Sequence, residues 1–190
     1  MKRKGCQALI ALLLVGLAWA GLADDVLPLE TRLTTFARQL QLGMTLSSVA
    51  IHSPSLADLH THAQQLINLL EGAQGRHFVR SDPSQNPSSG LMEDFAGIRQ
   101  RFEQAEVSGD MQALLFSPAK NVRTYLSLAL SSALRSIEQR RLDLAVLEMM
   151  QAYAFLSAAY GKPCDAPYVP ALWTILRAFN LDHATSPEEG

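Results

Sequence analysis

The fold class is decided by residues 117–161, which read SPAKNVRTYLSLALSSALRSIEQRRLDLAVLEMMQAYAFLSAAYG. Apolar residues recur there every three or four positions, as they do along one face of an α-helix, on either side of a polar break at residues 140–141. The spacing predicts one helix over residues 118–139 and a second over residues 142–160. Apolar residues surround much of the second helix, so we expect it to be the most buried helix of the fold.

Outward from this stretch, the same spacing predicts helices in most of the chain. Ser117 and Pro118 are residue types favoured at a helix N-cap and first helical position, which places a helix start there after a short turn at residues 111–116. Ser55 is the expected cap of an earlier helix that stops at Gly72. The remaining helices are expected over residues 29–51, over residues 91–107 and from Pro170 onward.

These helices predict an all-α fold, a helical bundle of four longer helices with one or two shorter ones. No segment alternates convincingly in the manner of a β-strand. We expect a single domain over residues 24–181 and a flexible polar tail over residues 182–190. The polar loop at residues 72–90 is long for a compact domain, and such loops are either functional or mobile. We expect this one to be mobile and leave a contribution to binding open.

The N-terminus has the features of an exported precursor. Basic residues at 2–4 precede an apolar stretch at residues 8–17, and small-residue cleavage sites follow at Ala20 and Ala23. The apolar stretch is too short for a comfortable bilayer span and is typical of a secretory signal peptide. We therefore expect residues 1–23 to be removed and the mature protein to be periplasmic or secreted.

Charge and cysteine content limit the partners and the bonds of the mature chain. Removal of residues 1–23 leaves 167 residues with 13 basic and 18 acidic side chains, a net charge of −5. Without a basic stripe, a nucleic-acid partner is not expected. A stable membrane span is not expected after signal cleavage either. Cys164 is then the single cysteine, and an intermolecular disulfide, a reactive thiol and an inert thiol all stay open for it.

His62 is the candidate metal ligand. His60 and His62 resemble a ligand pair, but side chains two positions apart on a helix point about 200° away from each other. His62 would therefore need a partner from another helix, such as Glu148 or a second histidine. Noncovalent haem binding with a methionine is the related alternative. A histidine at the edge of the core, hydrogen-bonded and without a ligand, is the structural alternative.

The helix end at residues 62–72 carries the pattern His-Ala-x4-Asn-x2-Glu-Gly, and a polar loop follows it. In this pattern the chain resembles a family of exported bacterial helical proteins that have no settled activity. The resemblance covers about a third of the mature chain, and it implies an all-helical fold and export. It makes His62, Asn68 and Glu71 candidates for a shared role. Asn68 and Glu71 could instead order the loop by bonding its backbone.

The sequence contains no catalytic signature for a nucleophile, a phosphate-binding loop or a standard metal site. An enzyme is therefore not the preferred interpretation, and no cofactor is assigned. We expect a binding or accessory protein that takes a protein partner or a small apolar ligand. The alternative is a metal- or haem-binding bundle that uses His62. The oligomeric state is not fixed by the sequence.

Overall fold

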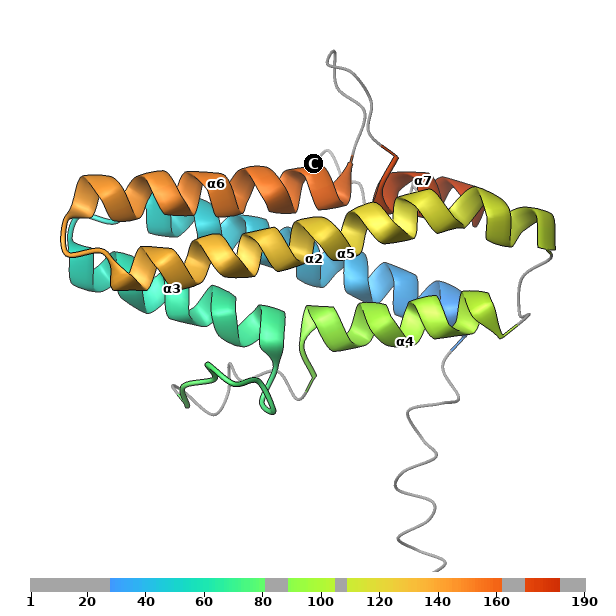
Figure 1. Ribbon diagram of the computed structural model, residues 1–190, viewed down its shortest axis with the longest axis horizontal. Helices are drawn as coiled ribbons and strands as arrows, with labels where there is room; N and C mark the ends of the chain where they lie inside the picture. Colours follow the sequence, from blue (N-terminus) through green and yellow to red (C-terminus); the bar gives the residue numbers. More distant parts are fainter. Residues whose placement is uncertain (1–27, 81–88, 105–108, 162–169, 182–190) are drawn as a thin grey trace, which may run out of the picture.

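The computed structural model describes residues 28–80, 89–104, 109–161 and 170–181. These residues form helices packed together and no strand, which confirms the predicted all-α bundle (Figure 1). Four helices are longer and two are shorter, as expected. They are α2 (Leu29–Ile51), α3 (Leu56–Glu71), α4 (Leu91–Glu103), α5 (Gly109–Glu138), α6 (Leu142–Tyr160) and α7 (Leu172–Ala178).

Helices α2 and α5 run the length of the bundle, and the other four lie in pairs beside them (Figure 1). α3 and α4 follow one another along one side, and α6 and α7 along the opposite side. Each of these four helices contacts both α2 and α5. The bundle therefore has four positions in cross-section, two filled by α2 and α5 and two by a pair of helices laid end to end, α3 with α4 and α6 with α7.

The core is a continuous apolar cluster with aromatic contacts along its length. Phe36 of α2 and Phe95 of α4 have ring centroids 5.1 Å apart. Phe102 stacks at 6.1 Å on Phe179, which follows α7, and Trp173 lies 6.2 Å from the ring of Tyr160. Trp173 and Phe179 are half-buried, and these contacts join the end of the chain to the bundle.

The junction between α3 and α4 depends on two glycines. The side chain of Ser55 caps α3 by accepting the N–H of Asp58, and α3 ends at Gly72 with φ of 74°, as predicted. A Cβ on Gly72 would lie 2.3 Å from the nitrogen of Gly90, and a Cβ on Gly90 would lie 2.2 Å from the carbonyl carbon of Glu71. The two backbones therefore touch, which lets α4 follow α3 along one side of the bundle.

The predicted helix start at Ser117 and Pro118 is wrong. α5 begins at Gly109, and Pro118 lies inside it, so residues 111–116 are helical and not a separate turn. Pro118 cannot donate a hydrogen bond to the carbonyl of Leu114, and an interior proline costs about 3 kcal/mol. Leu115, Ala119 and Val122 are buried on either side of it, and their packing offsets this cost. The neighbouring helix α4 also ends earlier than expected, at Glu103.

The prediction that the helix over residues 142–160 is the most buried is wrong as well. α6 has the expected bounds and ends at Gly161 in the left-handed conformation. Its inner face packs against α5 and α2, and the residues buried there are Ala145, Met149, Ala152, Leu156, Ala159 and Tyr160. The opposite face is apolar but exposed, with Leu147 55% and Met150 51% accessible. By length and composition alone, α6 is also apolar enough to cross a membrane.

Candidate functional site

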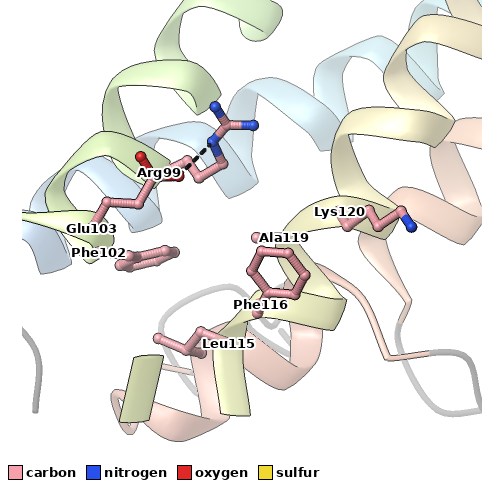
Figure 2. A pocket seen from close by; sticks show the side chains of 7 residues that line it. All are labelled: Arg99, Phe102, Glu103, Leu115, Phe116, Ala119 and Lys120. Carbon is pink, nitrogen blue, oxygen red and sulfur yellow. Dashed lines mark ion pairs between the residues drawn. The ribbon is translucent and has the colours of Figure 1, made fainter. Parts of the chain in front are cut away.

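The best-formed apolar pocket of the described residues lies between α4 and α5, at the end of the bundle remote from the loop after α3 (Figures 1 and 2). Its volume is about 230 Å³. For comparison, an engineered apolar cavity of about 150 Å³ binds benzene. The lining residues are Arg99, Phe102, Glu103, Leu115, Phe116, Ala119 and Lys120.

The inner wall of this pocket is apolar and fixed by the core. Phe102, Leu115 and Ala119 are all nearly fully buried, and Phe102 is held from behind by its stacking on Phe179. Phe116 forms the outer wall and is 73% exposed. Figure 2 shows the rings of Phe102 and Phe116 on opposite sides of the pocket. The small side chain of Ala119 leaves space that a larger residue would fill.

An ion pair lies on the rim. The Nε atom of Arg99 is 3.2 Å from Oε1 of Glu103, one helical turn away on α4. Nε of Arg99 is buried and has no hydrogen-bond partner, so the contact is an electrostatic one. The side chain of Lys120 extends away from the two rings (Figure 2). The rim therefore presents one paired arginine beside an apolar interior.

A smaller and more polar hollow of about 150 Å³ lies between α2 and α4, where Arg32 and Gln39 face Asp94. Nε of Arg32 and Oε1 of Gln39 are buried without a hydrogen-bond partner. Phe36 and Ile98 also line this hollow. Its walls carry positively and negatively charged side chains, but they offer a ligand less apolar surface than the pocket between α4 and α5.

Asn68 and Glu71, which the family resemblance made candidates, do not line this pocket or this hollow. They lie beneath the segment that follows α3. The amide of Asn68 donates to the carbonyl of Val79 at 2.7 Å, and its oxygen accepts the N–H of Val79 at 3.1 Å. Glu71 accepts the backbone N–H of His77 at 2.8 Å and contacts Nδ1 of the same residue at 2.8 Å. Gln64 adds a bond to the carbonyl of His77. Asn68 and Glu71 thus bond the backbone of the loop, which is the structural role considered above as an alternative.

His62 is not part of this cluster. It is half-buried, and its Nδ1 lies 3.1 Å from Oε1 of Gln65 on the same helix. Glu148, the proposed partner from another helix, instead accepts a hydrogen bond from Arg135 at 2.9 Å. Among residues 28–80, 89–104, 109–161 and 170–181, no three His, Cys, Asp or Glu side chains come together in a group that could hold a metal ion.

Several predicted features fall outside the residues that the structure describes. They are the signal peptide, the middle of the long loop at residues 81–88, Cys164 and the tail at residues 182–190. The described parts of the loop are residues 73–80, which are held against α3, and residues 89–90, of which Ser89 lines the hollow between α2 and α4. Neither part lines the pocket between α4 and α5. The idea that this loop contributes to a binding site is therefore not supported at that pocket.

The pocket was not among the features predicted from the sequence. Leu114, Leu115 and Phe116 are consecutive and apolar, so on a helix they cannot all face the core. That signal was hidden because these residues were assigned to a turn. Comparison of the chain with protein-family models, curated proteins and solved structures gave no match. The geometry of the described residues is therefore the basis for a functional proposal.

Proposed function

We propose that this protein is a binding protein that takes a small apolar ligand into the pocket between α4 and α5. The observation that carries the proposal is the combination of a buried apolar wall with an exposed aromatic mouth. Phe102 and Leu115 are fixed by the core, whereas Phe116 stands in solvent at 73% exposure. Concave sites with an apolar wall and a few polar groups at the rim are the usual sites of small ligands.

The size and charge of the pocket narrow the class of ligand. A volume of about 230 Å³ accommodates one or two rings or a short alkyl chain, not a large cofactor. The Arg99–Glu103 pair on the rim offers a donor and an acceptor to one polar end of the ligand. The expected ligand is therefore a small compound with an aromatic or aliphatic body and a single polar group.

A fluorescence titration with 1-naphthol, which has two rings and one hydroxyl group and so belongs to the expected ligand class, tests this proposal. Phe116→Ala removes the outer wall without disturbing the core, so the affinity should fall about 2- to 12-fold, the value of one aromatic contact. Leu147→Ala, which truncates an exposed apolar residue on α6, is the matched control and should leave the affinity unchanged. No binding by the wild-type protein, or a loss confined to Leu147→Ala, would contradict the proposal.

We also propose that the protein is exported from the cytoplasm. The support for export is the arrangement of residues 1–23, with basic residues, a short apolar stretch and small-residue cleavage sites in order. Expression of the full chain in a bacterial host should yield a periplasmic product whose mass corresponds to cleavage after Ala23 or Ala20. A cytoplasmic product of full mass would contradict this part of the proposal.

A further inference from the structure

The outer face of α6 is an exposed apolar surface of the described residues that the proposed ligand pocket does not use. We define this face by Leu147, Met150, Tyr153 and Ala154, which are all exposed. Val49 of the neighbouring helix α2 is also exposed, and it lines one hollow together with Tyr153. Apolar patches of this kind on the surface of a protein mark sites of interaction.

The four residues that define the outer face of α6 are uncharged, and the nearest charged residue on that side is Asp143, one turn before Leu147. Between Asp143 and Gly161 the helix carries a single charged residue, Glu148. Glu148 is directed to α5, where Arg135 binds it at 2.9 Å. At the start of α6, Arg141 and Asp143 neutralise one another at 2.6 Å, and this hydrogen bond lowers the pKa of Asp143. A partner for this face therefore needs no complementary charge, and like charges would not repel a second copy.

The order of side-chain sizes along α6 favours one geometry of self-association. Leu147 and Ala154 are seven residues apart, so they lie on the same side of the helix two turns from each other. In an antiparallel pair with a two-fold axis between Met150 and Gln151, Leu147 of one copy lies level with Ala154 of the other. Each large side chain then meets a small one. In a parallel pair the two leucines would oppose each other and the alanines would leave a gap.

We propose that a second copy of this chain docks on the outer face of α6, through antiparallel pairing of the two α6 helices about a two-fold axis. Closed two-fold symmetry is the commonest form of self-association, and it needs one self-complementary surface. Each Met150 lies beside the axis and contacts its symmetry mate. The interface is distinct from the pocket between α4 and α5, so this inference goes beyond the proposed function.

The area requirement defines how far the interface extends. A helix of 19 residues is about 28 Å long and about 10 Å wide. A standard interface buries about 800 Å² on each partner, more than one helix face supplies. Exposed residues of the two helices that flank α6 therefore have to take part. Val49 of α2 and Leu128 of α5 are the apolar candidates.

Sedimentation equilibrium of the purified protein tests this inference. The wild-type chain should have the mass of a dimer, and Leu147→Glu should raise the dissociation constant at least about tenfold because it buries an unpaired carboxylate. Leu114→Glu is the matched control, since Leu114 is an exposed leucine on α5 away from this face, 69% accessible against 55% for Leu147. A monomeric wild-type protein, or equal effects of the two substitutions, would overturn the inference.

A second variant tests the antiparallel fit and does not endanger the fold. Ala154 is exposed, so Ala154→Leu leaves the core of each copy intact. We expect it to weaken the dimer, because two added leucines oppose Leu147 of each partner, whereas a loosely apolar surface would associate more strongly. Stronger association of Ala154→Leu would overturn the proposed geometry. A monomeric protein that binds vesicles of phosphatidylethanolamine and phosphatidylglycerol through this face would overturn the choice of partner.

Discussion

α3 and α6 are similar in length, but the outward face of one is polar and covered by its own chain, whereas that of the other is apolar and exposed. The outward face of α3 is polar, and Asn68 and Glu71 bind the backbone of the segment that returns over them. The outward face of α6 is apolar, with Leu147 and Met150 more than half exposed. One helix is completed by its own chain. The other presents a surface that a partner completes, and the difference separates structural residues from functional candidates.

The two helices also show that a polar motif can have a structural role and that an apolar helix face can be a candidate interaction surface. Polar residues in a recognisable pattern, such as Asn68 and Glu71, attract a functional interpretation. Here their hydrogen-bonding groups are used within the chain: Asn68 is nearly fully buried and bonds both the N–H and the carbonyl of Val79. The apolar residues of α6 attract a structural interpretation, yet seven of the 19 residues of that helix are exposed.

The largest expected effect contrasts the two faces of α6. Leu156 is fully buried, so Leu156→Ala should lower the free energy of unfolding by about 2–5 kcal/mol. Leu147→Ala, on the exposed face, should change the stability of the isolated monomer by less than about 0.5 kcal/mol. Urea unfolding at a concentration below the dimer dissociation constant measures both. Similar losses for the two variants would show that the outer face is part of the folded core.

A smaller effect is expected at the polar face of α3. Asn68→Ala removes both hydrogen bonds to the backbone of Val79, each worth about 0.5–1.5 kcal/mol, so it should cost about 1–3 kcal/mol. The amide of Val79 should also exchange its hydrogen faster, which amide hydrogen exchange detects. Thr61→Ala, at an exposed position of the same helix, is the control. Unchanged exchange at Val79 would mean that the segment is held by other contacts.

The smallest effect is expected where the two helices meet across α2. A Cβ on Gly43 would contact side chains of Leu66 and Leu69 of α3 and of Leu156 of α6 at 3.5–3.6 Å, which are ordinary van der Waals distances. Gly43→Ala should therefore raise the free energy of unfolding by about 0.4–1 kcal/mol, because alanine restricts the unfolded chain. Thermal unfolding measures the change. A loss of stability would mean that α3 and α6 are too tightly packed to accept one methyl group.

The helical bundle could be predicted because its signals are local. Helical spacing gave α2 and α6 their bounds, and Ser55 and Gly72 marked the ends of α3. α5 was misread because the residue preference of Pro118 favours a helix start, whereas the packing of Leu115 and Ala119 keeps the helix continuous. Local preference cannot show an energy that comes from tertiary contacts.

The candidate site could not be predicted for the same reason. The pocket joins Phe102 of α4 to Phe116 of α5, and neither residue is unusual alone. The exposed face of α6 could not be predicted from composition, because a helix that is apolar on all sides is expected to be buried. The sequence does not show how many neighbouring helices surround it. Among the described helices, α5 and α2 are the two that contact α6 extensively. By contrast, the alternative that Asn68 and Glu71 order the loop could be read from their position at the helix end.

The most direct test of the central claim, that α6 is completed by a second copy, is disulfide formation at the two-fold axis. Met150→Cys, in a chain that also carries Cys6→Ser and Cys164→Ser, places one thiol beside its symmetry mate, within the range that a disulfide spans. Thr61→Cys in the same background reports random collision from an exposed position on α3. The account predicts a covalent dimer that forms under mild oxidation much faster for Met150→Cys than for Thr61→Cys. Equal rates for the two variants would contradict it.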